Sequence, residues 1–369
     1  MKIKTLTTYD VYNFGASLQA YALQTYLSNL GNEVEIINYQ PDYLTRKYDY
    51  KWVNPESSMS KFLVTRIIYR ILKFLQRQTT LKRKRKFDIF NHQVLKETSH
   101  KYLTYKELQM NPPEADLFFV GSDQIWNTFY EAGRDPAFYL EFVHKGKKAS
   151  YAASFSYLNI DDMNLKRIQK SLKKFQAVSV REYHGLEILN KIGVQGTWVL
   201  DPVFLLSQEE WIKLMTPFSK TEKYLLIYDF EKNKDLKEFA LLYAKEKNLK
   251  IYAINDTYPL TYADRNFNNE GPKEFISLIY HCDAFISNSF HGTAFSIIFN
   301  KPVFVFNRHR HKVNSRMESL MSLFNLKNFI INDKSMYETS IKASINYEEV
   351  NSIIKAETIK SKQFISQLL

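Results

Sequence analysis

The order of apolar runs and turns in residues 283–306 constrains the fold more than any other stretch of the chain. A short apolar run, Ala284–Ile286, ends in three polar residues, and His291 and Gly292 follow. An apolar segment with helical spacing comes next, and a second apolar run occupies Val303–Phe306. This order predicts a strand, a tight turn, a helix and a second strand. Such a unit is typical of parallel α/β sheets.

The same alternation extends along the whole chain and predicts an α/β protein with parallel sheets. The expected strands are 2–7, 34–39, 116–120, 148–152, 177–180, 196–199, 223–228, 250–253, 284–286 and 303–306. The expected helices are 16–30, 62–76, 163–174, 182–192, 235–246, 272–281, 293–299 and 315–324. Asp201-Pro202 marks a boundary between two Rossmann-like domains, 1–200 and 201–346, which we expect to face each other across a cleft. The helix-like tail, 347–369, is expected to cross back onto the first domain.

Length and composition exclude several classes of protein. A chain of 369 residues that is 45% hydrophobic can bury two cores. The single cysteine, Cys282, excludes an internal disulfide and a cysteine-based zinc site. The chain opens without a secretory pattern and has no apolar run of about 20 residues. We therefore expect a cytoplasmic protein, and because no carboxylate spacing forms a metal cage we expect neither metal nor cofactor.

Basic residues are concentrated in one amphipathic segment, residues 60–86. Of the formal net charge of +12, ten positive charges lie between Ser57 and Phe87, where there is no acidic residue. Because the rest of the chain is close to neutral, we expect no nucleic-acid partner. The segment predicts peripheral binding to an anionic membrane surface, at the inner face of the cell membrane. Three alternatives remain: packing of its apolar face on the N-terminal domain, an acidic partner protein, or RNA.

His291 is a candidate for proton transfer beside an anion. Ligands of open α/β sheets bind at the carboxyl ends of strands. His291 is expected there, at a helix N-terminus whose free amides suit an anion. Ser289, Gly292 and Thr293 belong to the same turn. The alternative is a buried histidine with a structural role.

Two further groups of basic residues follow strand ends. Arg181 ends the strand 177–180, where its guanidinium could grip a carboxylate or a phosphate. A structural ion pair with Glu182 is the alternative. Arg308, Arg310 and Lys312 follow the strand 303–306 and collect positive charge that suits a small polyanion. The alternative for these three is a solvated basic loop.

Two loops of the first domain have the chemistry of sugar binding. The first contains Asn13 and Gly15, which supply a turn before a helix that could hold an anion or a sugar hydroxyl. The second follows the strand 116–120 and offers a carboxylate, amides and an aromatic ring. Its candidate residues are Ser122, Asp123, Gln124 and Trp126. A helix cap made by Asp123 is the alternative for this loop.

Taken together, these stretches resemble the polysaccharide pyruvyl transferase family over most of the chain. The resemblance rests on Asn-Phe-Gly-Ala-Ser-Leu-Gln, Gly-Ser-Asp-Gln-Ile-Trp-Asn, Ser-Val-Arg-Glu, Asp-Pro and Ser-Phe-His-Gly-Thr, in this order. It implies two Rossmann-like domains arranged as in B-type glycosyltransferases. It also implies transfer of pyruvate from phosphoenolpyruvate to a sugar, which makes a cyclic ketal and releases phosphate. The implied acceptors are lipid-linked repeat units of capsular or other surface polysaccharides.

The resemblance assigns roles to residues of this chain. Arg181 and His291 take the positions of the family's catalytic arginine and histidine, and Lys312 is near the position of a further basic residue. The second domain becomes the donor side and the first the acceptor side. Many members have arginine where this chain has Ser289 and aspartate where it has Ala16. Arg308 and Arg310 are candidates to replace the missing charge.

Two other functions are compatible with the same sequence. A nucleotide-sugar glycosyltransferase has the same two-domain architecture, since a fold does not fix a function. A non-catalytic scaffold of a polysaccharide-assembly complex would keep the fold without binding phosphoenolpyruvate.

Overall fold

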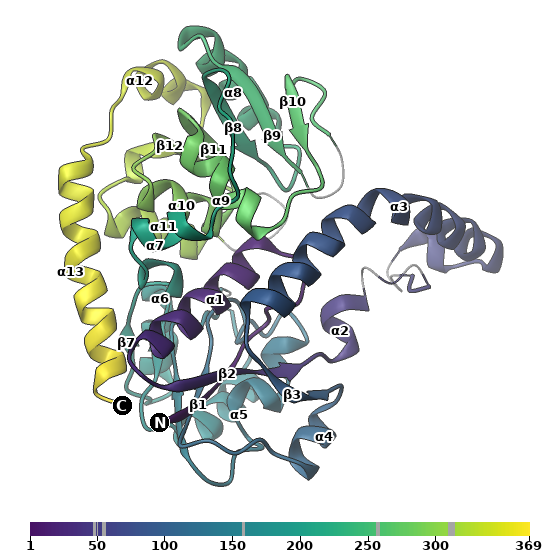
Figure 1. Cartoon of the computed structure of the whole chain (residues 1–369), viewed down its shortest axis with the longest axis vertical. Helices are drawn as coiled ribbons and strands as arrows, with labels where there is room; N and C mark the ends of the chain where they lie inside the picture. The colour runs from purple at the N-terminus through teal and green to yellow at the C-terminus, as the bar shows by residue number, and fades with distance from the viewer. Residues whose placement is uncertain (47–48, 50, 54–56, 157–158, 256–258, 309–313) are drawn as a thin grey trace.

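The computed structural model describes the chain except residues 47–48, 50, 54–56, 157–158, 256–258 and 309–313, and except the side chains of 58 and 75–80. Two lobes lie one above the other, with a long helix along one side and another projecting from the body (Figure 1). Each lobe is built around one parallel sheet.

The N-terminal sheet has the strand order β3-β2-β1-β4-β5, and all its neighbouring strands are parallel. Its strands are β1 (Lys2–Leu6), β2 (Glu33–Tyr39), β3 (Glu97–Tyr102), β4 (Leu117–Val120) and β5 (Lys147–Ser150). A short pair continues beside β5 through single bridges: β6 (Ser179–Val180) and β7 (Thr197–Trp198).

The C-terminal sheet has the order β10-β9-β8-β11-β12-β13 and is also parallel throughout. Its strands are β8 (Tyr224–Tyr228), β9 (Lys250–Ile254), β10 (Arg265–Phe267), β11 (Ala284–Ser287), β12 (Val303–Phe306) and β13 (Ile330–Ile331). Strands β8, β11 and β12 are entirely buried, which matches their continuous apolar sequences. The predicted α/β fold with two Rossmann-like domains is confirmed.

Helices connect the strands and cover the sheets. They are α1 (Phe14–Asn29), α2 (Asp42–Thr45), α3 (Leu63–Val94), α4 (Tyr105–Met110), α5 (Asp162–Leu172), α6 (Tyr183–Lys191), α7 (Gln208–Leu214), α8 (Lys234–Glu246), α9 (Pro272–His281), α10 (Phe290–Ile298), α11 (Ser315–Leu323), α12 (Tyr337–Lys342) and α13 (Tyr347–Ser366). Polar side chains begin many of them: Asn13 accepts a hydrogen bond from the amide of Ala16, and Ser207 and Glu210 form a capping box at α7.

The two domains share an apolar interface. Phe14 of α1 stacks on Phe275 of α9, with ring centroids 4.4 Å apart, and both belong to the hydrophobic core that fills the second domain. Helix α13 runs from the second domain along the first (Figure 1). Its end packs Phe364 and Ile365 against Ile3 under the N-terminal sheet. These contacts fix the position of one domain, and so of the carboxyl ends of its strands, relative to the other domain.

The predicted helix 62–76 is too short. Helix α3 has 32 residues and takes in the whole basic run 82–86, because lysine and arginine are good helix formers and Phe87 and Phe90 bury their rings in the body. Strands β3, β10 and β13 were also not predicted, since they are polar or only two or three residues long. Within the described residues, no helix combines the length and the apolar character needed to cross a membrane.

Candidate active site

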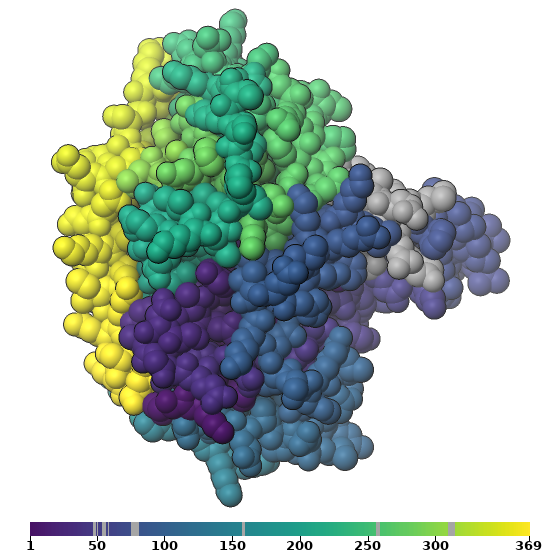
Figure 2. Space-filling model, in the orientation of Figure 1, coloured from purple at the N-terminus to yellow at the C-terminus, as the bar shows by residue number. Residues whose placement is uncertain are grey.

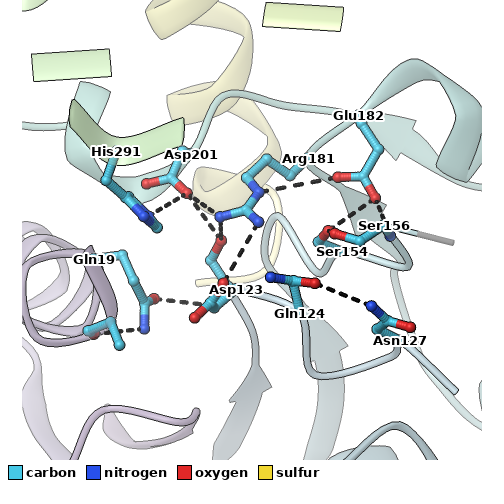
Figure 3. A network of polar contacts seen from close by, with 12 residues as sticks. Gln19, Asp123, Gln124, Asn127, Ser154, Ser156, Arg181, Glu182, Asp201 and His291 are labelled. Atoms are coloured by element: carbon cyan, nitrogen blue, oxygen red, sulfur yellow. Dashed lines mark hydrogen bonds and ion pairs between the residues drawn. The ribbon is translucent and has the colours of Figure 1, made fainter. Parts of the chain in front are cut away.

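Arg181 and Asp201 form the centre of the site (Figure 3). Arg181 directly follows β6, and its side chain is buried. Its Nη1 donates a hydrogen bond to Oδ2 of Asp201 over 2.7 Å. The other oxygen of Asp201, Oδ1, accepts a hydrogen bond from the amide of Val203 at 3.1 Å, at the start of the short helix Pro202–Phe204. Because both oxygens are held, the carboxylate fixes the orientation of the guanidinium.

The imidazole of His291 reaches the same carboxylate from the other domain. His291 is the second residue of α10, and its Nε2 lies 3.4 Å from Oδ2 of Asp201. Among the described residues, this buried nitrogen has no hydrogen-bond partner. On the other side of the ring, a Cβ built on Gly15 would lie 1.9 Å from Nδ1 of His291. Gly15 is buried and makes room for the imidazole, so its predicted contact with a sugar is corrected to a packing role.

The ionisation of Asp201 and of Arg181 depends on the charged groups around them. Burial by itself raises the pKa of the Asp201 carboxyl, but His291 and Arg181 together hold that pKa well below its usual range. Burial also opposes the charge of Arg181, yet its acidic neighbours outweigh this effect and raise the pKa of the guanidinium. Asp201 is therefore ionised at neutral pH, and it can stabilise a positive charge on His291.

A chain of hydrogen bonds supports Asp201 from the N-terminal domain (Figure 3). The hydroxyl of Ser122 donates to Oδ2 of Asp201 over 3.2 Å, and the amide of Ser122 donates to Oε1 of Gln19 over 3.2 Å. Gln19 in turn donates from Nε2 to Oγ1 of Thr7 over 2.9 Å. Asp123 places Oδ1 3.6 Å from Nη2 of Arg181. Ser122 and Asp123 therefore belong to this network.

Glu182 is a weaker partner of Arg181 than Asp201 is. Its Oε2 lies 3.9 Å from Nε of Arg181. Its Oε1 accepts hydrogen bonds from the Ser154 hydroxyl at 2.9 Å and the Ser156 amide at 3.0 Å. Among the described residues, Nε and Nη2 of Arg181 have no hydrogen-bond partner. Besides the nitrogen that bonds Asp201, the guanidinium thus has two buried donor nitrogens that could bind a ligand.

Arg316 is a buried cation that the sequence analysis did not single out. It is the second residue of α11, and 9% of its surface is exposed. Its guanidinium carbon lies 5.8 Å from the ring centroid of Phe290, the ring on which Arg181 stacks at 4.4 Å. No carboxylate of the described residues lies within 4.0 Å of it. Burial, followed by the nearby Arg181, lowers the pKa of Arg316 to about 10, so it remains charged at neutral pH without a paired anion.

One signal in the sequence could have pointed to Arg316. The predicted helix 315–324 follows the strand 303–306, so its first turn lies at the same sheet edge as His291. A basic residue in that turn can bind an anion at this edge, just as a basic residue in the loop 307–312 can.

In the predicted donor-binding turn, the side chain of Ser289 caps the N-terminus of α10. Oγ of Ser289 accepts a hydrogen bond from the amide of Gly292 at 3.3 Å, so this amide already has a partner. Gly292 faces Phe285, whose ring a Cβ would meet at 2.8 Å. Thr293 is buried, and among the described residues its hydroxyl has no partner.

The basic cluster after β12 is described only in part. Arg308 lies with Nε 3.4 Å from Oε1 of Glu231, and its guanidinium carbon is 4.9 Å from the ring centroid of Phe230. Its charge therefore has a partner within the second domain. Arg310 and Lys312 lie outside the described residues.

The predicted acceptor loops are corrected in part. The side chain of Asn13 caps α1, and Gln124 accepts a hydrogen bond from Nδ2 of Asn127 at 3.0 Å. Trp126 is fully buried, and its Nε1 donates to the carbonyl of Phe138 over 2.9 Å. A buried ring cannot stack on a sugar, so the prediction for Trp126 was wrong. Its neighbours Ser122 and Asp123 contact Asp201 and Arg181, and their predicted contact with an acceptor stays a prediction.

A hollow of about 560 Å³ lies between the two domains, beside Arg181. Nε1 of Trp198, one of its lining residues, donates a hydrogen bond to the carbonyl of Arg181 over 2.9 Å. Tyr183, which is 51% exposed, lies edge-on to Trp198 with ring centroids 5.9 Å apart. The remaining lining residues are His184, Asn307, Glu318, Ser319, Ser322, Lys327, Ile330 and Asn332. Aromatic rings with amide and carboxylate groups are suited to a polar ring such as a sugar.

Two parallel sheets with a site assembled between them define the class of two-domain Rossmann-like proteins to which B-type glycosyltransferases belong. One solved structure agrees with this class in its fold. Staphylococcus aureus MnaA with UDP is similar over 100% of this chain and 97% of that chain, at 12% identity and a TM-score of 0.50. UDP-N-acetylglucosamine 2-epimerase from Rickettsia bellii is similar over 100% and 96%, at 13% identity and a TM-score of 0.48.

A further solved structure is larger than this chain. A mutant of the Thermobaculum terrenum O-GlcNAc transferase is similar over the whole chain, which spans 66% of that structure, at 8% identity and a TM-score of 0.48. At 12% identity, the similarity to MnaA concerns the fold alone. No curated protein sequence matches this chain.

The family is shown by sequence. The polysaccharide pyruvyl transferase family model matches residues 13–310, which include Arg181, Asp201 and His291. The chain belongs to the polysaccharide pyruvyl transferase family.

Proposed function

We propose that this transferase moves pyruvate from phosphoenolpyruvate to a sugar of a lipid-linked surface-polysaccharide repeat unit and releases phosphate. The observation that supports it best is the shared carboxylate: Asp201 lies 2.7 Å from Arg181 and 3.4 Å from His291. This arrangement places a proton-transfer group next to a fixed cation in a buried site. Phosphoenolpyruvate has a carboxylate and a phosphate to neutralise and an enol carbon that must accept a proton.

The buried arginines are proposed to bind the two anionic groups. Among the described residues, two donor nitrogens of Arg181 have no hydrogen-bond partner, and Arg316 has no paired carboxylate. Both guanidinium groups lie against Phe290. A small dianion that reaches both would supply a counter-charge for Arg316, and charge-assisted hydrogen bonds from both arginines would orient it.

His291 is proposed to act as the acid. In its imidazolium form it would protonate the methylene carbon of phosphoenolpyruvate, and the ionised Asp201 would stabilise that form. One sugar hydroxyl would attack the resulting cationic carbon and lose its proton. Phosphate would leave with its oxygen, and a second hydroxyl would close the ketal and lose its proton. One hydroxyl proton restores His291, and the phosphate or solvent accepts the other.

The acceptor sugar is proposed to bind in the hollow beside Arg181. Tyr183 and Trp198 offer ring surfaces there, and Asn307, Glu318 and Asn332 offer hydrogen-bonding groups for hydroxyls. Trp198 donates a hydrogen bond to the main-chain carbonyl of Arg181, so the hollow adjoins the strand end from which the proposed donor-binding guanidinium extends.

Turnover of phosphoenolpyruvate with a panel of lipid-linked oligosaccharides and simple glycosides tests the proposal. The expected products are inorganic phosphate and an acceptor heavier by one pyruvate less one water. The variant His291→Gln should lose this turnover, while His92→Gln, on an exposed position of α3, should keep it. Sugar transfer from a nucleotide sugar, with no reaction of phosphoenolpyruvate, would instead assign a glycosyltransferase.

A further inference from the structure

The N-terminal part of α3 presents apolar side chains to solvent. We call residues 61–74 the α3 tip. Figure 2 shows the blue α3 segment projecting beyond the compact body of the molecule. The exposed fractions in the tip lie between 46% and 71% for Phe62, Leu63, Val64, Ile67, Ile68, Ile71, Leu72 and Phe74. Exposed apolar side chains gathered in one place mark an interaction site.

The other end of the same helix is firmly attached to the body. Phe87 and Phe90 are buried, and Arg83 places its guanidinium against the rings of Phe14 and Phe87 at 4.9 and 4.8 Å. Lys86 forms ion pairs with Glu270 and Glu274 of the second domain. Arg83 and Lys86 are thus engaged within the protein, and their contacts fix this end of the helix to the body.

The charge of the tip selects its partner. Lys61, Arg66 and Arg70 are exposed, and there is no acidic residue from 57 to 87. A second copy of this chain would oppose this positive charge with an identical one. The surface of an anionic bilayer combines negative headgroups with an apolar interior, and long basic side chains can reach the headgroups while apolar side chains lie deeper.

We propose that the α3 tip docks the protein on an anionic phospholipid membrane by inserting its apolar side chains at the boundary between headgroups and acyl chains. The proposal rests on the exposure and charge of the tip and does not depend on the proposed enzymatic function. One alternative for this segment was packing of its apolar face on the N-terminal domain. The exposure of the apolar side chains of the tip contradicts that alternative.

Co-sedimentation of the full chain with vesicles tests the proposal. Vesicles of phosphatidylglycerol and phosphatidylcholine should pellet the protein at low salt, and phosphatidylcholine alone should pellet much less. The double variant Ile67→Glu/Ile71→Glu removes two exposed apolar side chains one turn apart and should abolish binding. The double variant Lys61→Gln/Arg66→Gln should weaken binding about thirtyfold, because each of the two basic residues contributes about fivefold near an anionic surface.

The matched control is Ile359→Glu. Ile359 is 48% exposed on α13, which lies on the opposite side of the molecule from the α3 tip (Figure 1). This variant should bind vesicles like the unmodified protein, and circular dichroism should show the same helix content in all variants.

Three results would overturn the proposal. One is an unmodified protein that stays in the supernatant with anionic vesicles at low salt. Another is unchanged vesicle binding by Ile67→Glu/Ile71→Glu. The third is a dimer in sedimentation velocity that the same double variant dissociates, which would assign the tip as an interface between copies of this chain.

Discussion

Gly15 of α1 and His291 of α10 are in such close contact that a Cβ on the glycine would lie 1.9 Å from Nδ1 of the histidine. The two residues belong to different domains, so the contact links the position of the imidazole to the packing of α1 on the second domain. Among the site contacts, this one offers a direct test of how closely the position of His291 is controlled.

Substitution of Gly15 by alanine should displace the imidazole from Asp201. Overpacking at a buried site costs about 1–3 kcal/mol, so we expect a lower free energy of unfolding as well as lower turnover of phosphoenolpyruvate. Urea unfolding and an assay of phosphate release measure the two effects. Ser28→Ala, a small change at an exposed position of the same helix, is the control. Unchanged turnover in Gly15→Ala would show that the precise position of His291 is not needed.

The charge of Asp201 should stabilise the fold in a pH-dependent way. Its pKa is lower in the folded protein than its ordinary value near 4, so its stabilising contribution is present above that value and is lost as the pH falls. The unmodified protein should lose stability between about pH 5 and pH 3 more steeply than Asp201→Asn does. Chemical unfolding at a series of pH values measures the two slopes. Parallel slopes would contradict the assignment of a charged Asp201.

At neutral pH, Asp201→Asn should also be strongly destabilised. The change leaves the buried Arg181 without its nearest counter-charge, a loss of about 3–5 kcal/mol. Ser122→Ala removes only a neutral hydrogen bond to the same carboxylate and should cost about 1 kcal/mol. Free energies of unfolding for both variants give the comparison, and equal losses would argue against the dominant role of the ion pair.

Arg316→Gln separates ligand binding from stability. The buried guanidinium has no paired carboxylate among the described residues, so its removal should leave the melting temperature unchanged or higher. Affinity for phosphoenolpyruvate should fall about 10- to 100-fold, as expected for the loss of a charged hydrogen bond to an anion. Calorimetric titration measures the affinity, with the exposed Arg66→Gln as the control. Retained affinity would exclude Arg316 from the donor site.

Two aromatic substitutions should affect different properties, one acceptor binding and the other stability. Tyr183→Ala, in the hollow beside Arg181, should raise KM for the acceptor about tenfold and leave phosphoenolpyruvate binding unchanged. Trp126→Ala should instead lower the free energy of unfolding by about 3–5 kcal/mol, because it empties a fully buried site. Steady-state kinetics with varied acceptor, together with unfolding curves, distinguish the two. A KM effect confined to Trp126→Ala would move the acceptor site to the first domain's loop.

The alternation of apolar runs and turns, seen most clearly around residues 283–306, determined the α/β class, most of the strands and the placement of Arg181 and His291 at strand ends. These features follow from local periodicity and from the rule that parallel strands end at one edge of a sheet. The motifs also indicated the family, which the match over residues 13–310 confirms.

Only the tertiary structure decided which of these side chains meet. Trp126 and Ser122 lie four residues apart and are both buried, yet the first packs in the core and the second bonds Asp201. The partner of each side chain comes from another part of the chain, which local sequence does not encode. Arg316 joined the site because α11 folds back onto Phe290, a contact that no local pattern encodes. The ten basic residues between Ser57 and Phe87 form one group in the sequence. Packing on the body divides them, because a helix buries only the residues that face a partner and leaves the others to solvent.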